Sequence, residues 1–152
     1  MTKELHVFDR LLEISLLVQD DMGKAFAGTG LTVSRTHLLW ELSTLGPSSQ
    51  RALADVLQVS PRNVTGLVDA LEAAGYVVRS PHPTDRRTTL VRLTEQGETT
   101  MAQMERDRRA LAADLVADLD AGQLADFAST LDSVAERLRR LVEAAGSGQA
   151  PA

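Results

Sequence analysis

The sequence lacks several residue types and segments, and each absence removes a class of function. None of the 152 residues is cysteine, which excludes disulfide scaffolds, zinc fingers, thiol nucleophiles and peroxide sensing through cysteine. The three histidines are far apart, with no two at the spacing of helical metal ligands, so we expect no metal site and no cofactor. No apolar run approaches the ~20 residues that span a membrane. The N-terminus also lacks the basic and apolar regions of a secretory signal, and we expect a cytoplasmic protein without a membrane partner.

The net charge of −5 is unusual for a protein that binds nucleic acid, so the distribution of the charge matters. Between positions 47 and 97, six arginines stand against five carboxylates, which gives this segment a charge of +1 and leaves −6 for the flanks. Every cation of the central segment is an arginine, the residue suited to bidentate contacts with phosphate and guanine. A charge of +1 indicates nucleic-acid binding only weakly, so the positions of the arginines matter more than their number.

Long amphipathic helices are predicted on both sides of the central segment. Apolar residues at spacings of three and four predict a helix over residues 3–26, ended by paired glycines. A second long helix is predicted over about 94–119, and Gly122 is expected to separate it from a last helix over 123–144. This last helix has an a/d heptad pattern, which requires a partner helix. The apolar residues of the pattern are Leu124, Phe127, Leu131, Val134, Leu138 and Leu141.

Residues 31–97 predict three shorter helices followed by a β-hairpin. The hydroxyl residues that precede the helices are suited to capping: Thr32 or Ser34 for the first helix, Ser48 or Ser49 for a helix over 50–57, and Ser60 for a helix from Pro61 to about Ala74. Two β-rich runs, 76–79 and 88–93, are joined by a polar loop with two prolines. An isolated two-stranded hairpin is marginal in water, so this one must pack on the preceding helices as a wing.

Two short helices joined by a tight turn and followed by a wing make a winged helix-turn-helix. The expected fold class is therefore mainly α with a small β-hairpin wing, the reading module being embedded in a helical dimerisation domain. The helix from Pro61 is expected to enter the major groove of double-stranded DNA. Its exposed residues near the start are Ser60, Arg62, Asn63 and Thr65. Arg62 suits guanine or phosphate, Asn63 suits adenine, and the hydroxyls suit phosphates.

The tip of the predicted wing carries Asp85, Arg86 and Arg87. A narrow minor groove has an enhanced negative potential that attracts an inserted arginine. A neighbouring carboxylate weakens simple attraction to DNA, so Asp85 needs another role. We expect it to orient an arginine through a bidentate contact.

Several short motifs lie together between residues 31 and 97. They are QRALAD at 50–55, SPRNVT at 60–65, LEAAGYV at 71–77, and DRR at 85–87 followed by VRLTEQG at 91–97. In these motifs and in the order of its helices, the chain resembles the MarR family of bacterial regulators (multiple antibiotic resistance regulators). The resemblance implies a homodimer built from the first and the last two helices. It also implies binding to a pseudo-palindromic operator and repression of transcription.

The resemblance further implies roles for single residues. By position, Arg87 is the minor-groove arginine and Asp85 braces it. Many relatives release DNA when a small aromatic or anionic ligand enters a cleft between dimer and reading modules, and here Arg35, His37 and Trp40 are the candidate ligand contacts. The expected organisation is a dimerisation helix in 1–30, a DNA-binding module in 31–97, dimerisation helices in 98–145 and a disordered tail in 146–152.

Alternatives stay open at several positions. Trp40 stacks on an effector or packs in the core, and His37 contacts a ligand or is a hydrogen-bonded structural residue. Arg51 and Arg79 contact phosphate or are solvated surface charges. The carboxylates Asp69 and Glu72 are expected to face solvent.

Two other functions compete for the whole chain. One is a winged-helix module for protein contacts, and the other is a small-ligand carrier or enzyme in a helical bundle. Catalysis has little support, because no serine lies in a nucleophile-elbow pattern and no glycine loop suits a phosphate. We therefore do not expect an enzyme.

Overall fold

The computed structural model describes residues 2–146, and in that part of the chain it has six helices and three short strands. The chain divides into two units, Met1–Glu105 and Arg106–Ala152. Apart from Gly146, the predicted tail lies outside the described residues. No helix among residues 2–146 combines the length and the apolar character needed to cross a membrane.

The first helix, α1 (Lys3–Phe26), has the predicted bounds. It begins at Thr2, whose hydroxyl accepts a hydrogen bond from the backbone N–H of Leu5 at 3.3 Å. It ends before Gly28, one of the two glycines expected to terminate it, which has a φ of 73°. None of its side chains is buried within the described chain, although one face of the helix is apolar.

The reading module begins with three helices that start where capping residues predict. They are α2 (Val33–Leu45), α3 (Gln50–Leu57) and α4 (Pro61–Ala73). Of the candidate caps, Thr32, Ser49 and Ser60 are the ones used, and each side-chain oxygen accepts the backbone N–H three residues on. Helix α4 is followed by Gly75 at a φ of 85°, a left-handed conformation that commonly ends a helix.

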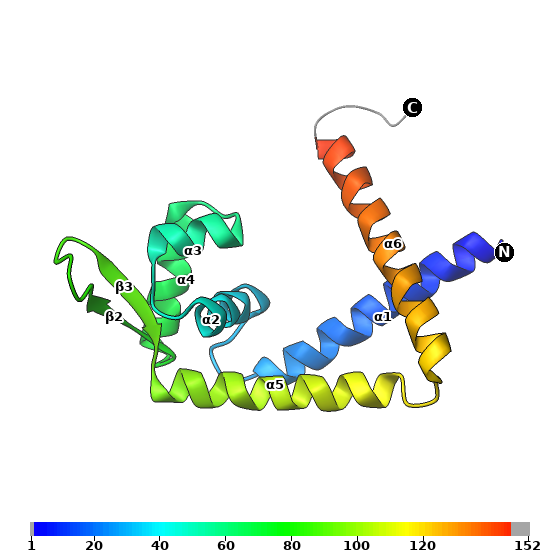
Figure 1. Ribbon diagram of the computed structural model, residues 1–152, viewed down its shortest axis with the longest axis horizontal. Coiled ribbons are helices and arrows are strands. Elements are labelled where there is room, and N and C mark those ends of the chain that lie inside the picture. Colours follow the sequence, from blue (N-terminus) through cyan, green and yellow to red (C-terminus); the bar gives the residue numbers. More distant parts are fainter. Residues whose placement is uncertain (1, 147–152) are drawn as a thin grey trace. The chain divides into compact units, whose positions relative to one another are not determined.

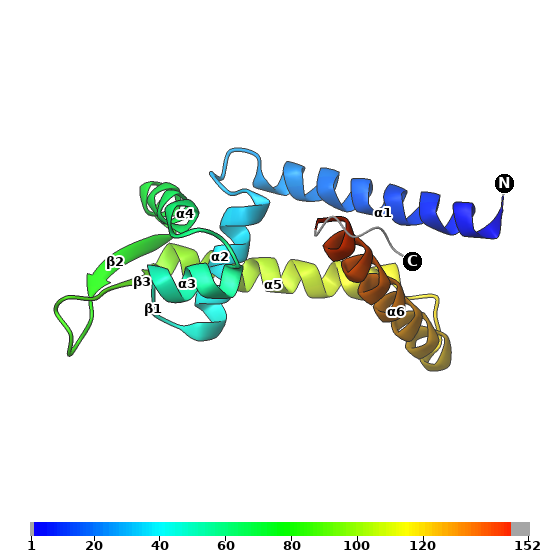
Figure 2. The same cartoon turned by 90° about the horizontal axis from the view of Figure 1, so that it is seen from above.

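The wing hairpin is confirmed, and it belongs to a three-stranded sheet whose third strand the sequence did not predict. Strands β2 (Val77–Pro81) and β3 (Thr89–Leu93) pair antiparallel, and β1 (Ser48–Ser49) pairs with the other edge of β3. Figures 1 and 2 show β2 and β3 extending beyond α3 and α4 to a free loop. The third strand stabilises the hairpin, because a lone pair of strands is marginal.

The core of the reading module lies between its helices and the sheet. Helices α2, α3 and α4 bury aliphatic side chains against one another and against β2 and β3. The fully buried side chains are Leu38, Leu39, Leu42, Leu53, Val64, Val68, Leu71, Val77 and Val91. Apolar burial of this extent is the main stabilising contribution in a small domain, and it fixes α4 on the surface of the module.

The helix that follows the wing, α5 (Glu95–Leu115), is joined closely to the base of the wing. The Thr94 hydroxyl donates to the Gly75 carbonyl at 2.6 Å and accepts the backbone N–H of Gly97 at 3.1 Å, so it caps the start of α5. A Cβ at Gly97 would lie 2.2 Å from the Tyr76 carbonyl oxygen. Only glycine therefore allows this approach.

The boundary between the last two helices differs from the prediction. Helix α5 ends at Leu115 rather than near Leu119, and α6 (Ala121–Gly146) already includes Gly122, which therefore does not interrupt. The start of α6 is set by a reciprocal pair. Asp120 accepts the backbone N–H of Gln123 at 2.9 Å, and the Gln123 side chain accepts the backbone N–H of Asp120 at 3.0 Å. This is the geometry of a capping box.

Candidate nucleic-acid interface

The N-terminal turn of α4 presents free polar side chains on the surface. Ser60, Arg62 and Asn63 are all exposed. Ser60 and Pro61 fix the start of the helix, since the serine hydroxyl accepts the Asn63 backbone N–H at 3.2 Å and the proline occupies the first turn. Within residues 2–146, the side chains of Arg62 and Asn63 make no hydrogen bond or ion pair. Both are therefore free to contact a ligand.

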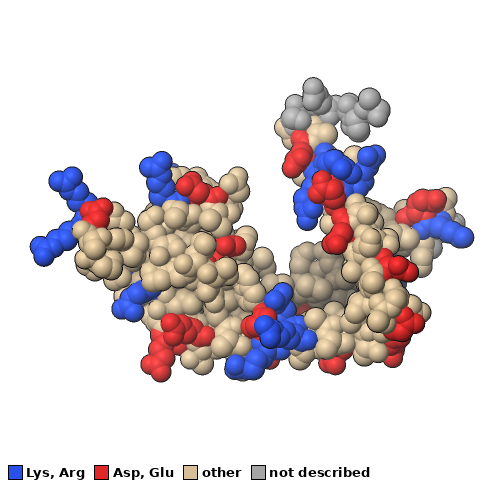
Figure 3. Space-filling view, in the orientation of Figure 1, with Lys and Arg blue, Asp and Glu red and all other residues tan. Residues whose placement is uncertain are grey.

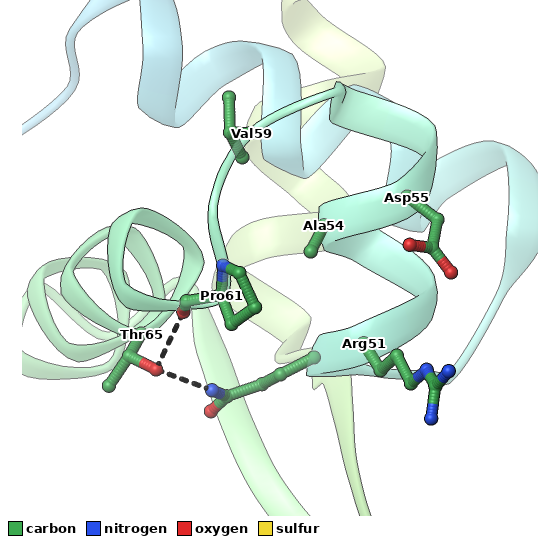
Figure 4. A pocket seen from close by; sticks show the side chains of 7 residues that line it. Arg51, Ala54, Asp55, Val59, Pro61 and Thr65 are labelled. Atoms are coloured by element: carbon green, nitrogen blue, oxygen red, sulfur yellow. Dashed lines mark hydrogen bonds between the residues drawn. The ribbon is translucent and has the colours of Figure 1, made fainter.

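Thr65, the fourth predicted contact on α4, is partly occupied within the protein. Its hydroxyl donates to the Pro61 carbonyl at 3.0 Å and accepts a hydrogen bond from the Gln50 side chain at 2.9 Å. Figure 4 shows both interactions at the groove between α3 and α4. A threonine hydroxyl has one proton, so Thr65 has none left for a phosphate unless the bond to Pro61 breaks.

The same groove has a volume of about 490 Å³. Arg51 and Asp55 belong to its rim, and Figure 4 shows both side chains on α3 pointing away from Thr65. Neither side chain has a hydrogen-bond or ion-pair partner in the described part of the chain. The alternatives that the sequence left open for Arg51 therefore remain open.

The loop at the end of the wing is organised by its own side chains. Asp85 accepts the backbone N–H of Arg87 at 3.0 Å and the hydroxyl of Thr88 at 2.9 Å. These two bonds, the backbone one above all, lower the pKa of Asp85 below its ordinary value. His82 Nδ1 accepts the backbone N–H groups of Thr84 and Asp85 at 3.2 and 3.1 Å. The loop is thus held in a defined turn.

The role expected of Asp85 is corrected by this geometry. We expected a bidentate contact with a guanidinium, but the carboxylate holds the backbone of Arg87 and leaves its side chain free. Arg86 and Arg87 are exposed, and neither guanidinium has a partner among residues 2–146. Figure 3 shows basic side chains projecting at the free end of the wing.

Arg79 is neither a solvated charge nor free to bind phosphate. Its guanidinium donates to Asp69 and to Glu72, at 2.5 Å in each case. Asp69 faces solvent as expected, its side chain being 60% exposed, but it and the partly buried Glu72 are also paired with Arg79. Sequence reasoning could not find this pairing, because the partners lie seven and ten residues away across the turn between α4 and β2.

The three candidate ligand contacts are occupied or packed within the reading module. Arg35 donates to the Gly30 carbonyl at 2.7 Å, His37 lies 3.5 Å from the Glu41 carboxylate, and Trp40 packs against the core. Nearby, where α1 ends and α2 begins, there is an open groove of about 440 Å³. Its lining is Gln19, Gly23, Phe26, Ala27, Leu31, Thr32 and Val33. None of the three candidates lines it.

Over residues 2–146, no three His, Asp or Glu side chains come together in a way that holds a metal ion. The features that remain are a helix with free polar side chains and a wing with two free arginines, both of which suit a polyanion.

Comparison with known proteins identifies similar proteins that are transcription regulators. A sequence model of the MarR family matches residues 31–89. The chain is 36% identical to the HTH-type transcriptional repressor NicR of Pseudomonas putida, over 61% of this chain and 59% of NicR. It is 25% identical to the transcriptional activatory protein BadR of Rhodopseudomonas palustris, over 91% of this chain and 82% of BadR.

Among solved structures, FabT of Streptococcus pneumoniae in complex with DNA is similar to this chain, with a TM-score of 0.80. The match covers 91% of this chain and 99% of FabT at 18% identity. At that identity the likeness concerns the fold alone. The chain spans about three fifths of the length of NicR, so what the whole relatives do is not transferred by the match itself.

Proposed function

The chain belongs to the MarR family of winged helix-turn-helix transcription regulators, which are not enzymes, and on this premise we propose that it is a cytoplasmic homodimer that binds a pseudo-palindromic DNA operator. One observation carries the proposal. The free polar side chains of α4 and the free arginines of the wing occur in one module, and each set suits a different groove of the same duplex.

Helix α4 is the element proposed for the major groove. Arg62 is suited to the acceptor pair of guanine and Asn63 to the donor and acceptor of adenine. Ser60 and the positive end of the helix suit a phosphate. The wing is proposed for the adjacent minor groove, with Arg87 inserted and Arg86 near the backbone, because a narrow minor groove attracts arginine.

The homodimer is supported by apolar side chains that the described chain leaves uncovered. No residue of α1 or α6 is buried. Phe8 of α1 is 56% exposed and Phe127 of α6 is 46% exposed, and both belong to helical apolar rows. Monomeric proteins rarely leave large contiguous apolar surfaces in water. A second copy of the chain is the partner that we propose for these helices, with 1–30 and 98–145 as the dimerisation segments.

We further propose that the dimer represses by occupying its operator, and that a small aromatic molecule releases it. The groove at the start of α2 supports the aromatic class over the anionic one, because no lysine or arginine lines it and Phe26 does. A ligand there weakens DNA binding only if it prefers a different separation of the two reading modules. A panel of phenols, titrated against the protein–operator complex, tests this release.

In vitro selection from a random duplex library, followed by a salt titration of the selected sequence, tests the DNA proposal. We expect an inverted repeat whose half-sites are about ten base pairs apart. Its affinity should fall steeply as salt rises, because neutralised phosphates release counterions. Failure to enrich any sequence would instead favour a module for protein contacts.

A further inference from the structure

Arg79 on β2 joins the wing to both helices of the helix-turn-helix. Two of its guanidinium nitrogens bind the carboxylates of Asp69 and Glu72 on α4. The third, Nε, donates to the Gln50 side chain of α3 at 3.1 Å, and Gln50 donates in turn to Thr65 of α4 at 2.9 Å. Every nitrogen of the guanidinium is thus engaged within one module.

The carboxylate of Glu72 doubles this link. Its Oε1 accepts the backbone N–H of Arg79 at 3.0 Å while Oε2 accepts the side chain. The backbone bond, with the side-chain bond second, lowers the pKa of Glu72, so the group stays ionised near neutral pH. The Arg79 side chain is 26% exposed, whereas Asp69 is 60% and Glu72 37% exposed, so water screens the contact with Asp69 more than the contact with Glu72.

Such a network fixes the rotation of α4 about its axis, which apolar packing alone constrains weakly. Burial of Val64, Val68 and Leu71 holds α4 against the core, but the hydrophobic effect is non-directional. The planar fork of an arginine, by contrast, imposes geometry on the groups that it bridges. Asp69 and Glu72 lie three residues apart, on one face of α4. Holding both therefore opposes rotation of α4 about its axis.

We infer that Arg79 is a positioning residue, which sets the angle between α4 and the wing so that both grooves are met at once. The inference rests on the proposed function, and it assigns to Arg79 no contact with DNA. When Arg79 is substituted, we expect the protein to lose its discrimination between operator and other sequences. A misplaced α4 no longer brings Arg62 and Asn63 to the base edges, whereas contacts with phosphates tolerate the displacement.

Removing the charge of Glu72 changes operator affinity in opposite directions under the positioning role and under simple electrostatics. Glu72→Gln removes a negative charge near the proposed DNA surface, and charge alone would then strengthen binding. The positioning role predicts instead that operator affinity falls about tenfold, comparable to the loss from one mismatched base pair. Asp55→Asn is the matched control, because it removes the same charge from α3 without breaking a side-chain bond of the described chain.

Arg79→Gln and Gln50→Ala complete the test, the latter leaving both ion pairs intact. We expect each to lower the ratio of operator to scrambled-DNA affinity severalfold while the slope of affinity against salt stays unchanged. A slope reduced by about one for Arg79→Gln would mark a phosphate contact and overturn the inference. So would operator binding by Glu72→Gln as tight as that of the parent protein. Thermal melts verify that each variant is folded.

A second measurement needs no DNA and keeps the inference separate from the proposed function. The chain has no cysteine, so Gly66→Cys on α4 and Thr89→Cys on β3 give two clean spin-label sites. Open space surrounds a Cβ at Gly66. With labelled chains diluted in unlabelled protein, we expect a narrow distance distribution that broadens with Glu72→Gln and not with Asp55→Asn. An unchanged distribution overturns the positioning role, whereas a parent protein that binds no duplex overturns only the DNA proposal.

Discussion

Ser60 has two separable duties at the start of α4, and three substitutions distinguish them. Its oxygen accepts the Asn63 backbone N–H, while its proton is free to donate to a phosphate. Ser60→Ala removes both functions, and the lost cap should cost about 1 kcal/mol, or roughly 2–4 °C in Tm for a chain of this size. Ser60→Gly costs only a few tenths of a kcal/mol in stability, yet it also loses the hydroxyl.

Ser60→Asp provides the opposite case, because aspartate caps as well as serine but places a negative charge beside the proposed phosphate. We expect Ser60→Gly to keep its Tm and to lose at least roughly tenfold in affinity per half-site, because one hydrogen bond to a charged group contributes about 1.5–3 kcal/mol. Ser60→Asp should keep its Tm and bind most weakly. Differential scanning calorimetry and operator titration measure the two quantities. Parental affinity in Ser60→Gly would refute the phosphate contact, and a parental Tm in Ser60→Ala would refute the cap.

Three further predictions follow from the wing and the long helices. Arg87→Ala should weaken operator binding by about 1–3 kcal/mol and reduce the salt slope by about one, with the dimer intact; unchanged affinity in a titration would remove Arg87 from the minor groove. The pKa of Asp85 is lowered from its ordinary 3.8, so the stabilisation that it gives the wing loop is fully present above that value and is lost as pH falls through the lower folded pKa. In the parent protein, the protection of the Arg87 and Thr88 amides from exchange should fall below about pH 4 toward that in Asp85→Asn, whose protection should not change over the same range; parental protection that is the same above and below that pH would contradict this. Leu131→Asp should abolish both the dimer and DNA binding, because it places a charge in the apolar seam of α6; light scattering that finds an intact dimer would exclude this interface.

Much of the fold was predictable because its signals are local. Thr32, Ser49 and Ser60 cap helices through contacts three residues away, and Gly75 takes the left-handed conformation that ends α4. Such residues specify an element boundary whatever the tertiary structure. The apolar spacing of α1 is a similar local signal, and its bounds were predicted correctly.

The errors arose where a distant segment or a competing local signal decides. Strand β1 has two residues, Ser48 and Ser49, and exists only because β3 pairs with it. At the start of α6, the capping pair of Asp120 and Gln123 outweighs the helix-breaking tendency of Gly122. That pair was visible in the sequence and could have been used.

The site was predictable in outline but not in its internal contacts. The free side chains of Arg62 and Asn63 follow from their position on a capped helix, and the exposed arginines of the wing follow from their polar loop. The pairing of Arg79 with Asp69 and Glu72 depends on how β2 returns along α4. Single-residue reasoning treats these three as independent surface charges, and only the folded geometry makes them one unit.

The most direct test of the account is a footprint of the protein on its selected operator, with probes that distinguish the two grooves. Protection of guanine N7 from methylation reports the major groove, and protection from hydroxyl radicals reports the backbone and the minor groove. We expect two major-groove footprints about 10–10.5 base pairs apart, each with flanking minor-groove protection that Arg87→Ala removes. A single footprint, or minor-groove protection that persists in Arg87→Ala, would contradict a dimer that reads two successive major grooves and anchors through its wings.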